Sequence, residues 1–103
     1  MSVQAVTADG WKIATVTAKG PSSNTDVGAG SAANVDLTLQ SNPADVKEVL
    51  AVKGVSGLPD GVVIAGISFP SSSTVRVRVF NPTGSTVTVN ANSVTATLLA
   101  RAA

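Results

Sequence analysis

The chain of 103 residues contains no cysteine, no histidine and no tyrosine. Without cysteine, disulfide bridges and thiolate metal sites are excluded. Without histidine, the most common general base and a frequent transition-metal ligand are also missing, so a Ser-His-Asp arrangement is impossible. The residue inventory therefore argues against an enzyme, and we expect no metal ion and no cofactor.

Charged residues are few, with seven Lys and Arg against six Asp and Glu. No basic cluster exists, so we expect no nucleic-acid binding. The acidic residues are scattered singly, most of them in predicted turns, and we interpret them as turn formers and solubilising charges. Gly28-Ala29-Gly30 lacks the Gly-Lys-Ser/Thr that completes a phosphate-binding loop, and we interpret it as a flexible loop.

Long apolar runs are absent as well. The longest, around residues 61–67, has about six residues, whereas a membrane-spanning helix needs about twenty. The first residues have neither the charged region nor the long apolar region of a secretory signal. We therefore expect a soluble product, made in a cytoplasm, that does not insert into a membrane.

The apolar residues that are present, 44% of the chain, are mainly Val, Ala, Leu and Ile, because only Trp11, Phe69 and Phe80 are aromatic. β-Branched Val and Thr suit a pleated, half-buried surface. Alternating segments between Gly, Pro, Ser and Asn breaks predict about six to eight strands. We predict an all-β fold, a small antiparallel β-sandwich of immunoglobulin-like or jelly-roll-like form. Residues 1–10 are expected to be an extended arm or short edge strand, and residues 11–103 a single domain.

The clearest pattern is the stretch TVRVRVFNPTGSTVTVN at residues 74–90. Its valines at 75, 77 and 79 alternate with polar residues and predict one buried face. The Asn-Pro-Thr-Gly that follows has the preferences of a type I turn. Asn81 is expected to bond its own backbone, and Gly84 to take a left-handed φ. The stretch therefore predicts a hairpin of two strands joined by a tight turn.

Further strands are expected at residues 11–18, 31–40, 48–55, 62–69 and 94–101. Buried faces are predicted for Val35, Leu37 and Leu39, and for Val94, Ala96, Leu98 and Ala100. In residues 48–55, Val49 and Ala51 are expected to face one way, and Leu50 and Val52 the other. Gly66 predicts a bulge or a close backbone approach. Residues 19–30 are interpreted as a surface loop, and residues 43–47 also suit a single helical turn.

Four residues are candidate partner contacts: Trp11, Arg76, Arg78 and Phe80. Trp11 suits either core packing or an interface. Arg76, Arg78 and Phe80 share the strand face opposite the three valines. This face is interpreted either as a solvated surface or as a contact stripe, because an exposed Phe beside Arg is typical of binding surfaces.

The sequence also resembles a known family. Residues 58–66, LPDGVVIAG, are followed by 74–84, TVRVRVFNPTG, and by Val87. A leucine-proline-x-glycine-valine loop, a valine-rich strand, an asparagine-x-threonine-glycine turn and a final strand occur in this order. The arrangement resembles a recurring β-domain of tailed-phage virion proteins. The upstream residues 29–52 also fit, and the resemblance covers roughly residues 11–101.

This family comprises small capsid decoration (cement) proteins and related domains of head and tail structural proteins. The resemblance implies a viral structural protein on the capsid surface of the virion, synthesised in the host cytoplasm, which stabilises the head by bridging capsomers. It implies the major capsid protein and copies of the chain itself, in a homotrimer, as partners. The alternatives are a phage tail or head-fibre structural protein, and a carbohydrate-binding or adhesion module. Three aromatics argue against the last, since sugar sites usually stack aromatic rings.

Overall fold

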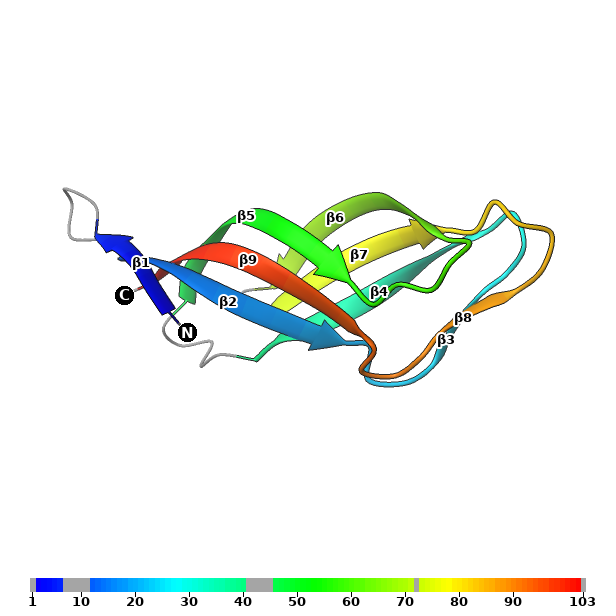
Figure 1. Ribbon diagram of the computed structural model, residues 1–103, viewed down its shortest axis with the longest axis horizontal. Coiled ribbons are helices and arrows are strands. Elements are labelled where there is room, and N and C mark those ends of the chain that lie inside the picture. Colours follow the sequence, from blue (N-terminus) through cyan, green and yellow to red (C-terminus); the bar gives the residue numbers. More distant parts are fainter. Residues whose placement is uncertain (1, 7–11, 41–45, 72, 103) are drawn as a thin grey trace.

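The computed structural model describes residues 2–6, 12–40, 46–71 and 73–102 (Figure 1). They form antiparallel strands with no helix among them, which confirms the predicted all-β sandwich. The strands are β1 (Ser2–Val6), β2 (Lys12–Gly20), β3 (Thr25–Val27), β4 (Ala32–Leu39), β5 (Val46–Ser56), β6 (Val63–Ser71), β7 (Thr74–Phe80), β8 (Val87–Val89) and β9 (Val94–Ala102). The helical turn suggested for residues 43–47 is not formed at its last two residues, which begin β5, and its first three lie outside the described residues.

One continuous sheet has the strand order β5-β9-β2-β4-β7-β6, and β1 pairs with β2 in addition. β2 and β4 pair only at residues 18–19 and 38–39, so the sheet folds over at this corner. β5-β9-β2 and β6-β7-β4 thereby become the two layers of a nearly closed sandwich (Figure 1). Gly20 lies at the corner, where a Cβ would meet the carbonyl oxygen of Asp36 and the Cα of Leu37. Glycine is therefore what allows the two layers to cross so closely.

Aliphatic side chains from both layers point inward and make the core. Alternate residues of each strand face the same way, so one face of each is buried. The core side chains of these strands are Ala14, Val16 and Ala18, Val35, Leu37 and Leu39, Val75, Val77 and Val79, and Val94, Ala96, Leu98 and Ala100. The buried faces predicted for residues 31–40, 74–80 and 94–101 are confirmed. Each fully buried Val or Leu contributes about 1.5–3 kcal/mol to stability.

β5 departs from the predicted two-residue alternation. Its pairing with β9 shifts three times, so β5 uses three residues wherever β9 uses two. Val49, Val52 and Val55 consequently lie opposite the core residues of β9 and pack against the core. The prediction that Val49 and Val52 face opposite ways is wrong, because a bulge separates each valine from the next. Leu50, in one of these bulges, is 45% exposed.

The hairpin predicted at residues 74–90 is wrong. β7 pairs with β4 on one side and with β6 on the other, so neither of its edges is free for β8. β8 pairs with β3 in a separate two-stranded ribbon, which extends from one end of the sandwich (Figure 1). Nor does Gly84 take the predicted left-handed φ. The described glycines with positive φ are Gly30, Gly57 and Gly61.

The same ribbon corrects the interpretation of residues 19–30 as a surface loop. Thr25–Val27 forms β3, and Val27 is buried together with Val89 of β8. Thr88 strengthens the ribbon by donating a hydrogen bond to a carboxylate oxygen of Asp26 at 2.7 Å. A segment rich in turn residues is thus held as a strand by a partner distant in sequence.

Asn81 is the one buried polar side chain among the described residues. Its Nδ2 donates to the carbonyl oxygens of Val27, at 2.9 Å, and Ser85, at 2.8 Å. Its Oδ1 accepts from the backbone N of Thr83, at 2.9 Å, and from the Thr83 hydroxyl, at 2.6 Å. The predicted bond of Asn81 to its own local backbone is confirmed. All four hydrogen-bonding positions of the amide are used, and one of them joins the end of β7 to β3.

Candidate functional site

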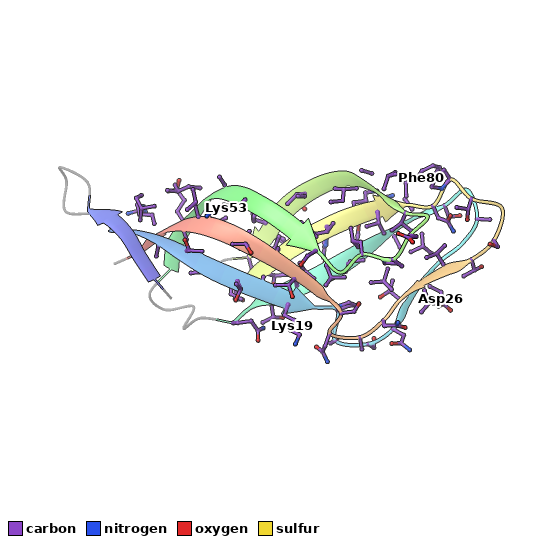
Figure 2. All side chains as sticks on the ribbon, viewed as in Figure 1. Lys19, Asp26, Lys53 and Phe80 are labelled. Carbon is purple, nitrogen blue, oxygen red and sulfur yellow. The ribbon has the colours of Figure 1, made fainter. Side chains whose placement is uncertain are left out.

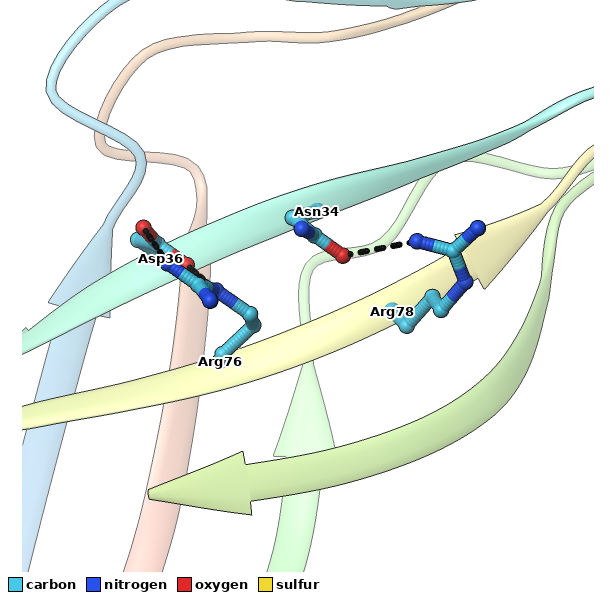
Figure 3. Close-up of polar contacts among 4 residues, drawn as sticks. All are labelled: Asn34, Asp36, Arg76 and Arg78. Atoms are coloured by element: carbon cyan, nitrogen blue, oxygen red, sulfur yellow. Dashed lines mark hydrogen bonds and ion pairs between the residues drawn. The ribbon is translucent and has the colours of Figure 1, made fainter. Parts of the chain in front are cut away.

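The side chains of β4 and β7 that point away from the core meet in direct cross-strand pairs. The register places Asp36 opposite Arg76 and Asn34 opposite Arg78, and Figure 3 shows both pairs in contact. Phe80 follows on the same side of β7. We call these five residues the outer face. The prediction that Arg76, Arg78 and Phe80 share one side of their strand is confirmed.

Arg76 and Asp36 form an ion pair with two hydrogen bonds. Arg76 Nε donates to Oδ1 at 2.8 Å, and an Arg76 Nη donates to Oδ2 at 3.2 Å. The hydrogen bonds from Arg76, aided by its charge, lower the pKa of the Asp36 carboxyl against a smaller opposing effect of burial. The same contacts raise the pKa of Arg76. Both side chains remain well exposed, so water and salt screen the pair and limit its effect on stability.

Replacing Asp36 with Asn is expected to lower the urea midpoint of unfolding slightly at neutral pH. Because the pKa of Asp36 is lowered in the folded protein, its contribution is present at neutral pH and lost as the pH falls through that lowered pKa. The difference between Asp36→Asn and the parent should therefore shrink below about pH 4. Urea unfolding of the variant and the parent, at neutral pH and below about pH 4, measures this difference in stability. Repeating it with about 1 M salt shows how far salt screens the ion pair. A difference that grows on acidification would contradict the assignment.

Arg78 has a different partner. An Arg78 Nη donates to Oδ1 of Asn34 at 3.1 Å, so this pair retains its positive charge. Phe80 is half-buried and lies at the end of β7 (Figure 2). The exposed Phe that the sequence suggested beside Arg is therefore not Phe80, and the exposed phenylalanine is Phe69 of β6. Trp11 lies outside the described residues.

β6 is exposed along its whole length. Val63, Ile64, Ile67 and Phe69 leave between 38% and 52% of their surface accessible. We call these four residues the β6 edge. They include four of the five large apolar residues that are exposed in the described part of the chain, and Leu50 of β5 is the fifth.

Two residues of the β6 edge lie beside core residues of the neighbouring strand. Ile64 and Ile67 lie opposite Val79 and Val77, two core residues of β7, yet both remain exposed. A register shift between Ile64 and Gly66 confirms the bulge predicted from Gly66. The sequence analysis did not single out this edge. A signal was available, since no charged residue occurs at residues 61–75.

Three acidic side chains of the described residues are used in separate contacts. Asp26 accepts from Thr88, Asp36 pairs with Arg76, and a Glu48 carboxylate oxygen lies 3.7 Å from Arg101 Nε. Among the described residues, no three acidic, His or Cys side chains gather as a metal site would require. The same part of the chain contains no apolar helix of membrane-spanning length.

Two surface features therefore stand out in the described residues. The outer face is polar and mostly paired within itself. The β6 edge is apolar and has no covering partner in the described part of the chain. In the comparisons with known proteins, the chain matches no family model, no curated protein and no solved structure.

Proposed function

We propose that this protein is a tailed-phage capsid decoration protein. It binds the outside of the head and stabilises the shell by bridging capsomers. The proposal combines the family resemblance of residues 11–101 with the surface of the sandwich. In this proposal the protein acts by making contacts and performs no chemical reaction.

The observation that carries the proposal is the β6 edge. Soluble sheet proteins usually protect a terminal strand with charges, prolines or a covering segment. β6 has one proline, Pro70, near its end, but no charged residue along its nine positions, and it exposes four large apolar side chains. Exposed apolar surface of this kind marks sites of protein association.

The proposed partners are the major capsid protein and further copies of this chain. The outer face supplies the polar part of such a contact, because Arg78 keeps an uncompensated charge next to half-buried Phe80. Arginine and aromatic residues are enriched at protein interfaces. The proposed location is therefore the capsid surface of the virion.

Quantitative mass spectrometry of purified virions tests this proposal. We expect the chain in hundreds of copies per particle, in a fixed ratio to the major capsid protein. Particles that lack it should lose DNA at a lower temperature, and adding the purified protein back should restore the parent value. An Arg78→Glu variant that folds normally should restore less of the temperature at which DNA is lost. Lys19→Glu is the matched control, because Lys19 is also an exposed cation but lies near the end of β2 (Figure 2).

The outcomes separate the alternatives. Absence from virions would overturn the proposal. A few copies or tens of copies per particle would instead indicate a tail or head-fibre protein. Specific hits on a glycan array together with absence from particles would indicate a carbohydrate-binding module.

A further inference from the structure

The free side of β6 is the feature from which a partner can be inferred. β6 is one end of the continuous sheet, so the backbone groups on its outer side pair with no other described strand. An exposed strand of this kind can accept another strand through main-chain hydrogen bonds. We propose that β6 pairs antiparallel with β6 of a second copy of this chain, about a twofold axis near Ile67.

Full overlap of the two nine-residue strands places Ile67 opposite the partner's Ile67. Directly opposite residues of antiparallel strands point to the same face, so the two isoleucines cover each other on the core side. The other side of the junction carries only Gly66 and Ser68 near the axis. No atom lies within 4 Å of a Cβ built at Gly66, so this side offers no obstacle. The segment from Gly66 to Ser68 is also in regular register with β7, whereas both of its flanks are bulged.

Charge also favours a second copy. Identical strands face each other in such a pair, so any charge near the axis would meet itself. β6 has none, and the nearest charges are those of Arg76 and Arg78 on β7. Arg76 of one copy and Arg78 of the other would be three strand spacings apart, about 14 Å, and corresponding arginines would be further apart. This exceeds the Debye length of about 8 Å at physiological salt, so their repulsion is largely screened.

The other end of the sheet is less suited to the same role. β5 carries Glu48 and Lys53, of which Lys53 is labelled in Figure 2, and a register shift interrupts the strand at every third residue. Bulges and charges are the features that prevent pairing at a sheet edge. β6 has two register shifts and Pro70 as well, but they lie outside the segment from Gly66 to Ser68, and the strand carries no charge. Of the two ends of the β5-to-β6 path, β6 is therefore the one that fits a copy of itself.

The molar mass of the purified full-length chain tests the pairing without any capsid. Light scattering or sedimentation equilibrium should give twice the 10.2 kDa of one chain. Ile67→Lys should raise the dissociation constant about a hundredfold or more, because it places two like charges opposite each other. Leu50→Lys, at the similarly exposed site on β5, should leave the dimer intact. Thermal unfolding of both variants confirms that they are folded.

The twofold axis has its own test. Ile67→Glu should also dissociate the dimer, and mixing it with Ile67→Lys should restore a heterodimer, because opposite charges then face each other. A wild-type mass of one chain, or of the three chains that the family resemblance implies, would overturn the pairing. So would an Ile67→Lys variant that remains dimeric. These results do not depend on virion binding, so the pairing and the capsid proposal can fail separately.

Discussion

Replacing Asn81 with Asp is expected to lower the free energy of unfolding by about 3–5 kcal/mol at neutral pH. The two side chains have nearly the same shape, so packing is unchanged. The amide nitrogen, however, donates to the carbonyl oxygens of Val27 and Ser85. A carboxylate oxygen in its place would face both carbonyls with no proton to share, in a fully buried site. The loss is a large part of the 5–15 kcal/mol typical of a domain.

The sign of the pH dependence identifies this mechanism. Burial against two carbonyl oxygens raises the pKa of the introduced carboxyl in the folded protein above its unfolded value. The folded state then binds more protons than the unfolded state, so stability falls as the pH rises above about 4. On acidification the variant recovers part of its stability, because a protonated carboxyl can donate one hydrogen bond. It cannot donate two, so recovery stays incomplete.

Chemical denaturation of Asn81→Asp between about pH 3 and 7 measures both effects. Asn90→Asp is the matched control, because Asn90 is exposed and the same change of charge should have little effect there. Equal losses at the two positions would show that net charge, and not the hydrogen bonds of Asn81, determines the result. A loss at position 81 that does not change with pH would contradict the proposed carbonyl contact.

The second large effect is expected at Gly57, where alanine should cost about 2–4 kcal/mol. Gly57 has a φ of +87°, which side-chain-bearing residues rarely adopt. A Cβ there would also collide with the carbonyl oxygen of Ser93 and lie 3.3 Å from the Cα of Val94. Both contacts are backbone atoms, so no side chain can rotate away. The substitution forces apart the end of β5 and the start of β9.

Gly54→Ala is the matched control. Gly54 lies three residues earlier in β5, its φ is not positive, and a Cβ at this position would have no atom within 4 Å. Stability there should be unchanged or raised by up to about 1 kcal/mol, since alanine reduces the freedom of the unfolded chain. Thermal unfolding of the two variants gives the comparison. Similar losses at both positions would indicate a general intolerance of β5 to alanine.

The sequence predicted the buried strand faces well where a strand has neighbours on both sides. The valines of β7 and the alternating residues of β9 follow a two-residue period, because β7 pairs with β4 and β9 pairs with β2 without any register shift. In β5 the same rule failed. Valine recurs there every third residue, and only the pairing with β9 shows that bulges make this spacing face inward.

The hairpin failed for a different physical reason. The turn residues were interpreted correctly at Asn81, which does bond to the backbone of Thr83. Local turn preferences cannot report which strand edges are already occupied, and β4 and β6 occupy both edges of β7. β3 was missed in the same way, because its residues favour turns and only β8 makes them a strand.

The candidate site was only partly predictable. Alternation placed Arg76, Arg78 and Phe80 on one side, but the partners Asp36 and Asn34 come from β4, 40 and 44 residues earlier. Exposure of β6 depends on its position at the end of the sheet, which composition does not encode. Its uncharged, aliphatic sequence is equally typical of a fully buried strand.

The pairing of β2 with β9 affects how this protein is made. Residues 12–20 bind residues 94–102, so the first long strand has no partner on that side until the last strand has left the ribosome. β2 therefore lacks this partner while the strands between are made, although β4, β7 and β6 can already pair with one another. Such distant pairings place folding on a timescale of about milliseconds to seconds. We expect the uncharged, exposed β6 to be the described segment most prone to aggregation in that interval.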